Sequence, residues 1–147
     1  MIIKPLTYEA TIKTLSAARI ARLGCAKNDQ PFVVPISIAY SADYIYAFST
    51  VGRKIEWMRI NPQVCIEVEE VTSRHNWQTV IVLGLYEELT DKPELREQAY
   101  GLLSRSGNWW EPGYVTTTLS NGMWRPLDPI YFRISVKEIS GHQGVPS

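Results

Sequence analysis

Apolar and polar residues alternate along most of this chain, with the period of two that is typical of half-buried β-strands. The clearest case is residues 31–40, where a large apolar residue returns at every second position from Phe32 to Tyr40. Pro35 interrupts this run, and because proline has no N–H to donate, it indicates a sheet edge, a bulge or a local opening. The alternation predicts strands over residues 18–26, 31–40, 44–48, 63–70, 77–90 and 130–139.

Three shorter segments carry apolar residues at helical spacing instead. In the first, Thr7 is placed to cap a helix, and Tyr8, Ile12 and Leu15 fall on one face. Consecutive strands with helices only at the edges favour an antiparallel barrel. Gly84, in the longest strand, marks a bend or bulge that lets such a sheet curl. The helical spacing predicts helices over residues 7–15, 52–60 and 91–104.

The composition is that of an ordinary globular protein without a dominant charge. The 147 residues are 45% hydrophobic, and 15 Lys and Arg balance 15 Asp and Glu. This balance argues against nucleic-acid binding, and no apolar run approaches the roughly 20 residues of a membrane span. We expect a single domain over residues 1–147, with the last residues, 141–147, frayed. The N-terminus lacks the pattern of a signal peptide, so the cytoplasm is the expected location.

Cysteines and histidines give no sign of a metal centre. Cys25 and Cys65 lie far apart in apolar runs and form no C-x-x-C pair, so both are expected to be small buried residues. His75 precedes the 77–90 strand. It could donate a proton or contact a substrate there, and the alternative is that it is a plain surface histidine. His142 lies in the expected tail and is assigned no role. Neither a catalytic triad nor a pair of catalytic carboxylates stands out.

The most informative chemistry lies where the 44–48 strand ends. The run Phe48-Ser49-Thr50-Val51-Gly52-Arg53-Lys54 predicts a strand, a tight turn and a helix start that carries two cations. A helix N-terminus has partial positive charge and unpaired N–H groups, so cations there are unfavourable without an external anion. Ser49 and Thr50 add hydroxyl donors, and the planar fork of Arg53 suits phosphate. We interpret the run as a phosphate-binding corner; the alternative is a solvated turn with surface cations.

Several segments, in this order and spacing, resemble the FMN-binding split β-barrels related to pyridoxamine 5′-phosphate oxidase. The segments are 18–25, 30–36, 38–40, 52–58, 61–65, 77–84, 110–113 and 132–134. The resemblance covers nearly the whole chain and points to the flavin-nucleotide-binding or nitroimidazole-resistance-like branch. It implies a mainly β fold, an antiparallel Greek-key barrel with peripheral helices. It also implies FMN as the cofactor, rather than FAD or NAD, and a homodimer.

The resemblance further implies a site at the subunit interface. The turn after the third strand would hold the flavin phosphate, the second strand would line the ring, and the second subunit would complete the site. The alternatives are plain strand packing for the second strand, an ordinary strand surface for Gln78 and Thr79, and burial for Trp77. The implied residues are Ser49, Thr50, Arg53 and Lys54 for the phosphate, Pro35, Ile36, Ser37 and Ile38 for the ring, and Trp77, Gln78 and Thr79 from the second subunit.

The function that follows from the resemblance has two forms. The first is a small oxidoreductase that passes electrons from a nicotinamide or other donor to small flat acceptors such as nitro compounds or quinones. The second is a non-catalytic flavin-binding carrier or sensor, and a haem- or deazaflavin-binding barrel is a lesser option. True pyridoxamine phosphate oxidases carry an arginine and a histidine one residue apart near the C-terminus. Residues 131–144 lack that pair, so pyridoxamine phosphate oxidation is not expected.

An aromatic segment, residues 108–114, stands between the third predicted helix and the last strand. Its rings at Trp109 and Trp110 would offer stacking surface for a flat substrate, which makes the segment a candidate lid over the flavin. Burial of these rings against the barrel or the second subunit is the alternative.

Overall fold

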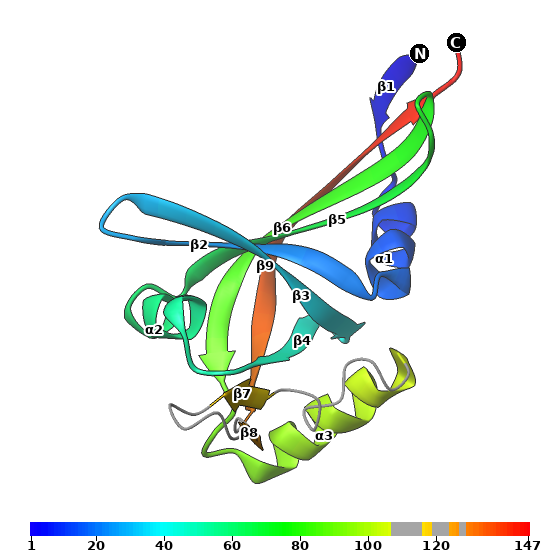
Figure 1. The fold of residues 1–147 in the computed structure, drawn as a ribbon. Helices are drawn as coiled ribbons and strands as arrows, with labels where there is room; N and C mark the ends of the chain where they lie inside the picture. Colours follow the sequence, from blue (N-terminus) through cyan, green and yellow to red (C-terminus); the bar gives the residue numbers. More distant parts are fainter. Residues whose placement is uncertain (107–115, 119–123, 127–128) are drawn as a thin grey trace.

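The computed structural model describes residues 1–106, 116–118, 124–126 and 129–147 (Figure 1). The lid hypothesis for Trp109 and Trp110 lies outside these residues. The elements are β1 (Ile2–Pro5), α1 (Tyr8–Ala17), β2 (Ile20–Lys27), β3 (Gln30–Ser41), β4 (Tyr44–Ser49), α2 (Arg53–Ile60), β5 (Gln63–Ser73), β6 (Asn76–Glu88), α3 (Pro93–Leu103), the 3-10 turn Ser104–Ser106, β7 (Thr116–Thr118), β8 (Trp124–Pro126) and β9 (Ile130–Val145).

The main sheet closes into an antiparallel barrel, as the alternation predicted. Its strands follow the order β1-β9-β4-β3-β2-β5-β6, and β6 pairs back onto β9. Strands β2, β3 and β4 are joined by hairpins, and β5 returns to lie beside β2, which is the Greek-key arrangement. The helices lie outside the barrel (Figure 1). The predicted fold class is therefore confirmed.

Two tight hairpins set the register of the sheet. The turn between β2 and β3 has positive φ at Asn28 (50°) and Asp29 (64°), and the turn between β3 and β4 has positive φ at Ala42 (49°) and Asp43 (71°). Positive φ at both central residues matches the right-handed twist of the flanking strands. Both turns fall in the gaps between the predicted strands 18–26, 31–40 and 44–48, although Ala42 is a poor residue for this conformation.

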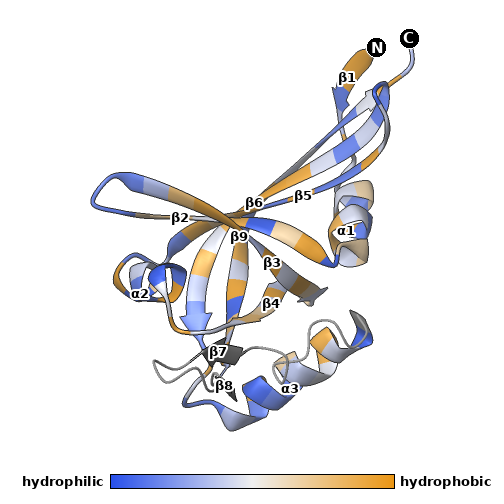
Figure 2. Ribbon diagram, in the orientation of Figure 1, coloured by the Kyte–Doolittle hydropathy of each residue, from blue (hydrophilic) through white to orange (hydrophobic). Residues whose placement is uncertain are grey.

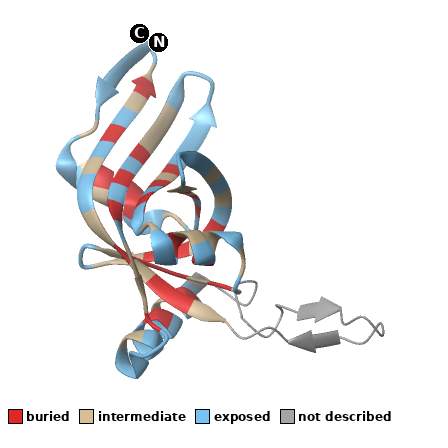
Figure 3. Cartoon of the chain, turned by 90° about the vertical axis from the view of Figure 1, so that its left-hand side faces the viewer, coloured by how far each residue is buried: buried red, intermediate tan, exposed pale blue. Residues whose placement is uncertain are grey.

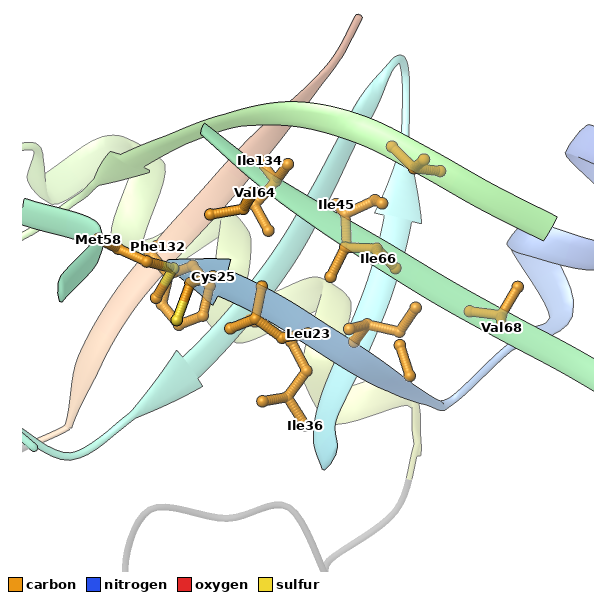
Figure 4. Packing of buried hydrophobic residues seen from close by; sticks show 14 of the residues in the cluster. Leu23, Cys25, Ile36, Ile45, Met58, Val64, Ile66, Val68, Phe132 and Ile134 are labelled. Carbon is orange, nitrogen blue, oxygen red and sulfur yellow. The ribbon is translucent and has the colours of Figure 1, made fainter. Parts of the chain in front are cut away.

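Alternate residues of β2, β3, β4, β5, β6 and β9 point into an apolar core, and a second cluster packs between α3 and residues of β3, β4 and β9. Figure 4 shows buried side chains from β2, β3, β4, β5 and β9 gathered between the strands, with Met58 of α2 beside Phe132, and Figure 3 shows the alternation of buried and exposed positions. Val64, Ile66 and Val68 point inward on β5, as predicted. Cys25 is buried, but Cys65 is exposed on the opposite face of β5, so its predicted burial is wrong. The two thiols are free.

The expected irregularity at Gly84 is a bulge between β6 and β9. The register shifts between Leu83 and Gly84, so that Leu83 lies opposite Glu138 and Gly84 opposite Val136. A Cβ at Gly84 would lie 2.3 Å from the carbonyl oxygen of Ser135, so only glycine permits this close approach of the two strands.

Four expectations about the edges of the fold are wrong. Residues 141–145 are not frayed, because they extend β9 and pair with both β6 and β1. Strand β1 carried no clear alternation and was not predicted. The strands predicted to end at residue 70 and to begin at residue 77 extend further, and the pair of Ser73 and Asn76 closes a tight hairpin between them. On α1 the buried residues are Thr11, Thr14 and Leu15, whereas Tyr8 is exposed, because polar threonines face the barrel there. The described helices α1, α2 and α3 are too short or too polar to cross a membrane.

Candidate functional site

The predicted phosphate-binding corner lies where β4 leaves the barrel and α2 begins. Ser49 is the last residue of β4, and Gly52 is the N-cap of α2. No side chain of the described residues caps this helix, so its first N–H groups stay available to a ligand. The hydroxyl of Ser49 is buried and donates to the carbonyl oxygen of Thr50 at 3.1 Å. Thr50 is half-buried beside it.

Arg53 is exposed, and two aromatic rings direct its side chain. Its guanidinium carbon lies 5.3 Å from the ring centre of Phe32 and 5.9 Å from that of Trp57. The two rings are 5.8 Å apart. Such cation–π contacts restrict the guanidinium without using its N–H donors. Within the described part of the chain, no carboxylate forms an ion pair with it. The spacing of Arg53 and Trp57, one helical turn apart, was a readable signal that sequence reasoning missed.

Lys54 has the least usual environment of the corner. It is half-buried, and no carboxylate among the described residues pairs with it. Burial lowers the pKa of its ammonium group below the ordinary value of 10.5, and the nearby Cys25 thiol raises that pKa only in part. Burial, and then Cys65, raise the pKa of Cys25, while Lys54 lowers it. A half-buried cation without a counter-ion, beside an uncapped helix N-terminus, is a donor set that fits a phosphate dianion.

The segment predicted to line the ring has one open edge. Strand β3 pairs with β2 from Gln30 to Ser37, but pairs with β4 only from Ile38 onward. The Arg22–Pro35 pair lies between hydrogen-bonded pairs, so the backbone of Pro35 points to the open edge and its missing N–H breaks no ladder bond. The position of Pro35 is thereby explained.

The side chains of this segment divide between the core and the surface. The side chains of Ile36 and Ile38 are buried in the core, and the backbone N–H of Ile38 donates to the carbonyl oxygen of Arg19 at 3.0 Å, so the backbone groups on the open edge are those of Pro35 and Ser37. Pro35 is exposed and Ser37 is half-buried. Because β3 and β4 separate beyond the pair of Ile38 and Ala47, the open edge of β3 and the phosphate-binding corner border the same opening. Figure 1 shows the two strands diverging from their shared hairpin, with α2 at the wide side.

The third predicted group, residues 77–79, lies elsewhere in the same chain. Thr79 lies opposite His142 of β9, whereas Ser49 lies opposite Ile130. Those two positions on β9 are separated by about 40 Å along the strand, at roughly 3.3 Å per residue. The structure therefore brings two of the three predicted groups together within one chain, and leaves the third on the long arm formed by β5, β6 and β9 (Figure 1).

Two residues of this third group have partners within the chain. A Cβ on Gly144 would lie 2.5 Å from the ring of Trp77, so one face of the indole lies directly on that glycine. The amide oxygen of Gln78 lies 2.6 Å from the hydroxyl of Thr14 on α1. Thr79 is half-buried with no side-chain hydrogen bond to another described residue. The face of the Trp77 indole that points away from Gly144 is therefore the face that could contact a ligand or a second subunit.

The two histidines lie on the long arm, near residues 77–79 and away from the phosphate-binding corner of the same chain. His75 lies exposed in the β5–β6 turn, where its backbone N–H donates to the hydroxyl of Ser73 at 3.4 Å. His142 lies within β9, not in a tail. In the described part of the chain, no group of three His, Cys, Asp or Glu residues is placed to hold a metal ion.

A pocket of about 670 Å³ lies on the outer face of the barrel, and no predicted site residue lines it. We call its exposed apolar residues the outer patch: Val33, Cys65, Leu83 and Leu85. Lys137 and Glu138 border this patch. Strand β6 is apolar on both faces here, because its alternate residues Val80 and Val82 fill the core. Most strands instead alternate between hydrophobic and hydrophilic positions (Figure 2).

Comparisons with known proteins agree with this architecture. The sequence profile of a family described as pyridoxamine 5′-phosphate oxidase matches residues 7–143. An uncharacterized protein of Rhizobium meliloti (strain 1021) is 39% identical over 116 residues, which cover 77% of each chain. The crystal structure of a FAD-binding protein from Mesorhizobium loti is 40% identical, with a TM-score of 0.80 over 98% of this chain and 99% of that chain.

A more distant structure shares only the fold. A protein of Bacteroides thetaiotaomicron, provisionally described as a 5-nitroimidazole antibiotic resistance protein, superposes with a TM-score of 0.70 at 19% identity. The superposition covers 97% of this chain and 89% of that chain. Since one fold carries many activities, the shared barrel does not by itself assign a reaction. The extent of the profile match and the identity to the two rhizobial proteins do assign the family: this chain belongs to the pyridoxamine 5′-phosphate oxidase family of split β-barrels.

Proposed function

We propose that this protein binds a flavin nucleotide, FMN, and uses it as a small oxidoreductase. The observation that carries the proposal is the half-buried, unpaired ammonium of Lys54 at the uncapped N-terminus of α2. A phosphate dianion there would receive helix N–H groups, the Lys54 charge and the fork of Arg53. The description of the Mesorhizobium loti relative as a FAD-binding protein agrees with a flavin ligand.

The proposed roles follow from what each residue exposes. Arg53, Lys54, Thr50 and the first N–H groups of α2 bind the phosphate, while buried Ser49 fixes the turn through its bond to Thr50. The open edge of β3 beside Pro35 offers backbone groups to the polar rim of the ring. When bound, the flavin supplies the electron-transfer chemistry itself. The barrel excludes water from one side of the ring, and the other side is left for a small flat acceptor such as a nitro compound or quinone.

We also propose a homodimer in which each subunit completes the site of the other. Residues 77–79 lie about 40 Å along β9 from the corner of their own chain, so they would contribute to a site only across an interface. The outer patch is the surface that such an interface would cover, because β6 is apolar on both faces there. Lys137 and Glu138 at its border would pair across a two-fold axis, each with the other residue of the second copy.

The first test is the visible absorption spectrum of the purified protein, with FMN, FAD and riboflavin titrated into the flavin-free form. Both FMN and FAD carry a phosphate on the ribityl chain, so both would use the corner, and tighter binding of FMN is expected. Replacing Arg53 and Lys54 together by alanine should weaken FMN binding at least tenfold, or roughly 1.4 kcal/mol, and leave riboflavin nearly unchanged. Arg96→Ala, an exposed cation on α3, is the matched control.

The second test separates turnover from binding. Bleaching of the bound flavin by NADH or NADPH, followed by recovery with a nitro compound or quinone, would support the oxidoreductase. Bound flavin that no nicotinamide reduces would instead support the non-catalytic carrier or sensor. A protein that takes up no flavin would overturn both. Pyridoxamine phosphate is not proposed as a substrate, because residues 141–145 form a paired strand that contains His142 but lacks the arginine one residue away from a histidine that the true oxidases carry.

A further inference from the structure

Glu88, at the end of β6, accepts four hydrogen bonds from side chains. Its Oε1 accepts from Nε of Arg59 and from the hydroxyl of Tyr86, each at 2.8 Å. Its Oε2 accepts from Nη2 of Arg59 at 3.1 Å and from the hydroxyl of Thr90 at 2.8 Å. Arg59 belongs to the last turn of α2, so this carboxylate joins the helix to the barrel wall through a two-point contact.

Backbone and amide contacts fix the same end of α2. The backbone N–H of Tyr86 donates to the carbonyl oxygen of Pro62 at 2.9 Å. The side-chain amide of Asn61, the C-cap of α2, donates to the carbonyl oxygen of Ala26 at 3.1 Å. The hydrogen bonds from Arg59 are the main cause that lowers the pKa of Glu88 to about 2, so the carboxylate is ionised at neutral pH.

A helix as short as α2 depends on such anchors. It has 8 residues, of which Ile55 and Met58 are buried in the core. Isolated helices shorter than about 12 residues are marginal in water, so tertiary contacts set the position of this one. Arg53 and Arg59 are separated by about 9 Å along the helix axis. A change of tilt at the Arg59 end therefore moves the N–H groups and cations at the other end.

We propose that Glu88 is a positioning residue for the phosphate-binding corner: by holding Arg59, it fixes the axis of α2 and so the anion donors at its N-terminus. This inference rests on the proposed function. Glu88 itself touches no ligand, and its effect passes through the helix. The residues of β3 that would bind the flavin ring are held by the sheet, so their positions do not depend on Glu88.

The experiment compares two ligands that differ by the phosphate alone. Dissociation constants of FMN and riboflavin are measured by fluorescence titration for the wild-type protein and for Glu88→Gln, which keeps the shape but removes the charge. We expect the FMN constant to rise about five- to tenfold, as for a weakened charge-assisted contact. The riboflavin constant should change less than about twofold. The positioning role would be overturned if the two dissociation constants rose equally, or if neither of them rose.

Glu87→Gln is the matched control. Glu87 is the adjacent residue and also holds two cations, Lys92 and Arg133, but among the described residues no hydrogen bond or ion pair joins its side chain to α2. The control should leave the preference for FMN over riboflavin unchanged. Arg59→Lys, which keeps the charge but loses the two-point contact, should lower the preference in the same direction, and it serves if Glu88→Gln does not fold.

The wild-type protein separates the two proposals. If it binds FMN no more tightly than riboflavin, the phosphate-binding corner fails, and the positioning role fails with it. If it prefers FMN and Glu88→Gln keeps the full preference, only the positioning role is overturned.

Discussion

Lys54 and Arg53 are neighbours in the chain, but the fold gives them different surroundings. Arg53 is exposed over the rings of Phe32 and Trp57. Lys54 is half-buried, and burial lowers the pKa of its ammonium group. The sequence showed two adjacent cations and could not distinguish them, because the burial of Lys54 depends on contacts with residues distant in the chain, such as Cys25 of β2. Their contributions to phosphate binding should therefore differ with pH.

We predict that FMN affinity falls as the pH is raised, and that this loss of affinity occurs at a pH lower than 10.5, the ordinary pKa of lysine. The lowered pKa of Lys54 means that its ammonium loses its proton at a lower pH than a solvated lysine does, and the attraction to phosphate is lost with it. The measurement is a series of FMN titrations from neutral to alkaline pH. Lys54→Arg, which stays charged, should give a flatter profile. Identical profiles for the two proteins would show that Lys54 does not titrate at the site.

Glu88 leads to a prediction about acid stability. Its pKa in the folded protein, about 2, lies below the ordinary value of 4.5, mainly because of Arg59. The ionised form therefore favours folding: its contribution is fully present above the ordinary pKa and disappears as the pH falls through about 2. Since the pair is partly exposed, Glu88→Gln should lower the free energy of unfolding by about 1–2 kcal/mol at neutral pH. Urea unfolding of the wild-type protein and of Glu88→Gln should be compared at neutral pH and in acid. The difference in the free energy of unfolding should disappear in acid, and an equal difference at both pH values would contradict the prediction.

At the scale of elements, local signals predicted most of the fold. Alternation placed the six long strands and both tight turns, and Gly84 marked the bulge, because these features depend on near neighbours in the chain. Strand β1 and the end of β9 had no local signal, since each is held by pairing with a partner more than a hundred residues away. For the same reason the bond between Arg59 and Glu88 could not be read from the sequence.

The turn between β3 and β4 offers a test of this local reasoning. Ala42 has a φ of 49°, a conformation that costs alanine more than asparagine. Ala42→Asn should therefore raise the free energy of unfolding by about 0.5–1 kcal/mol, as measured by urea unfolding. Ala10→Asn, inside α1, should lower it, because asparagine is a poorer helix former than alanine. A loss of stability at both positions would mean that the positive φ of Ala42 carries no strain.

At the scale of the whole molecule, one chain provides only part of the predicted site. The phosphate-binding corner and the open edge of β3 border one opening, whereas residues 77–79 lie on the long arm. Sequence reasoning named all three groups but could not say which would meet within a chain, because that depends on how β9 spans the barrel. The outer patch is exposed and apolar, at 64% exposure for Val33 and 46% for Leu83. Both observations favour a second copy against this face.

A charge placed in the outer patch should separate the proposed dimer and weaken flavin binding together. In Leu83→Glu the new carboxylate would lie in the proposed interface beside Glu138, its cross-strand neighbour, and burying two like charges there is strongly unfavourable. Size-exclusion chromatography with light scattering should give a dimer for the wild-type protein and a monomer of about 16.8 kDa for the variant. Because Leu83 is exposed on the single chain, the variant should still fold. Gln98→Glu, at an exposed position of α3, should leave the dimer and flavin binding intact. A monomeric variant that binds FMN as tightly as the wild-type protein would show that residues 77–79 of a second copy are not part of the site.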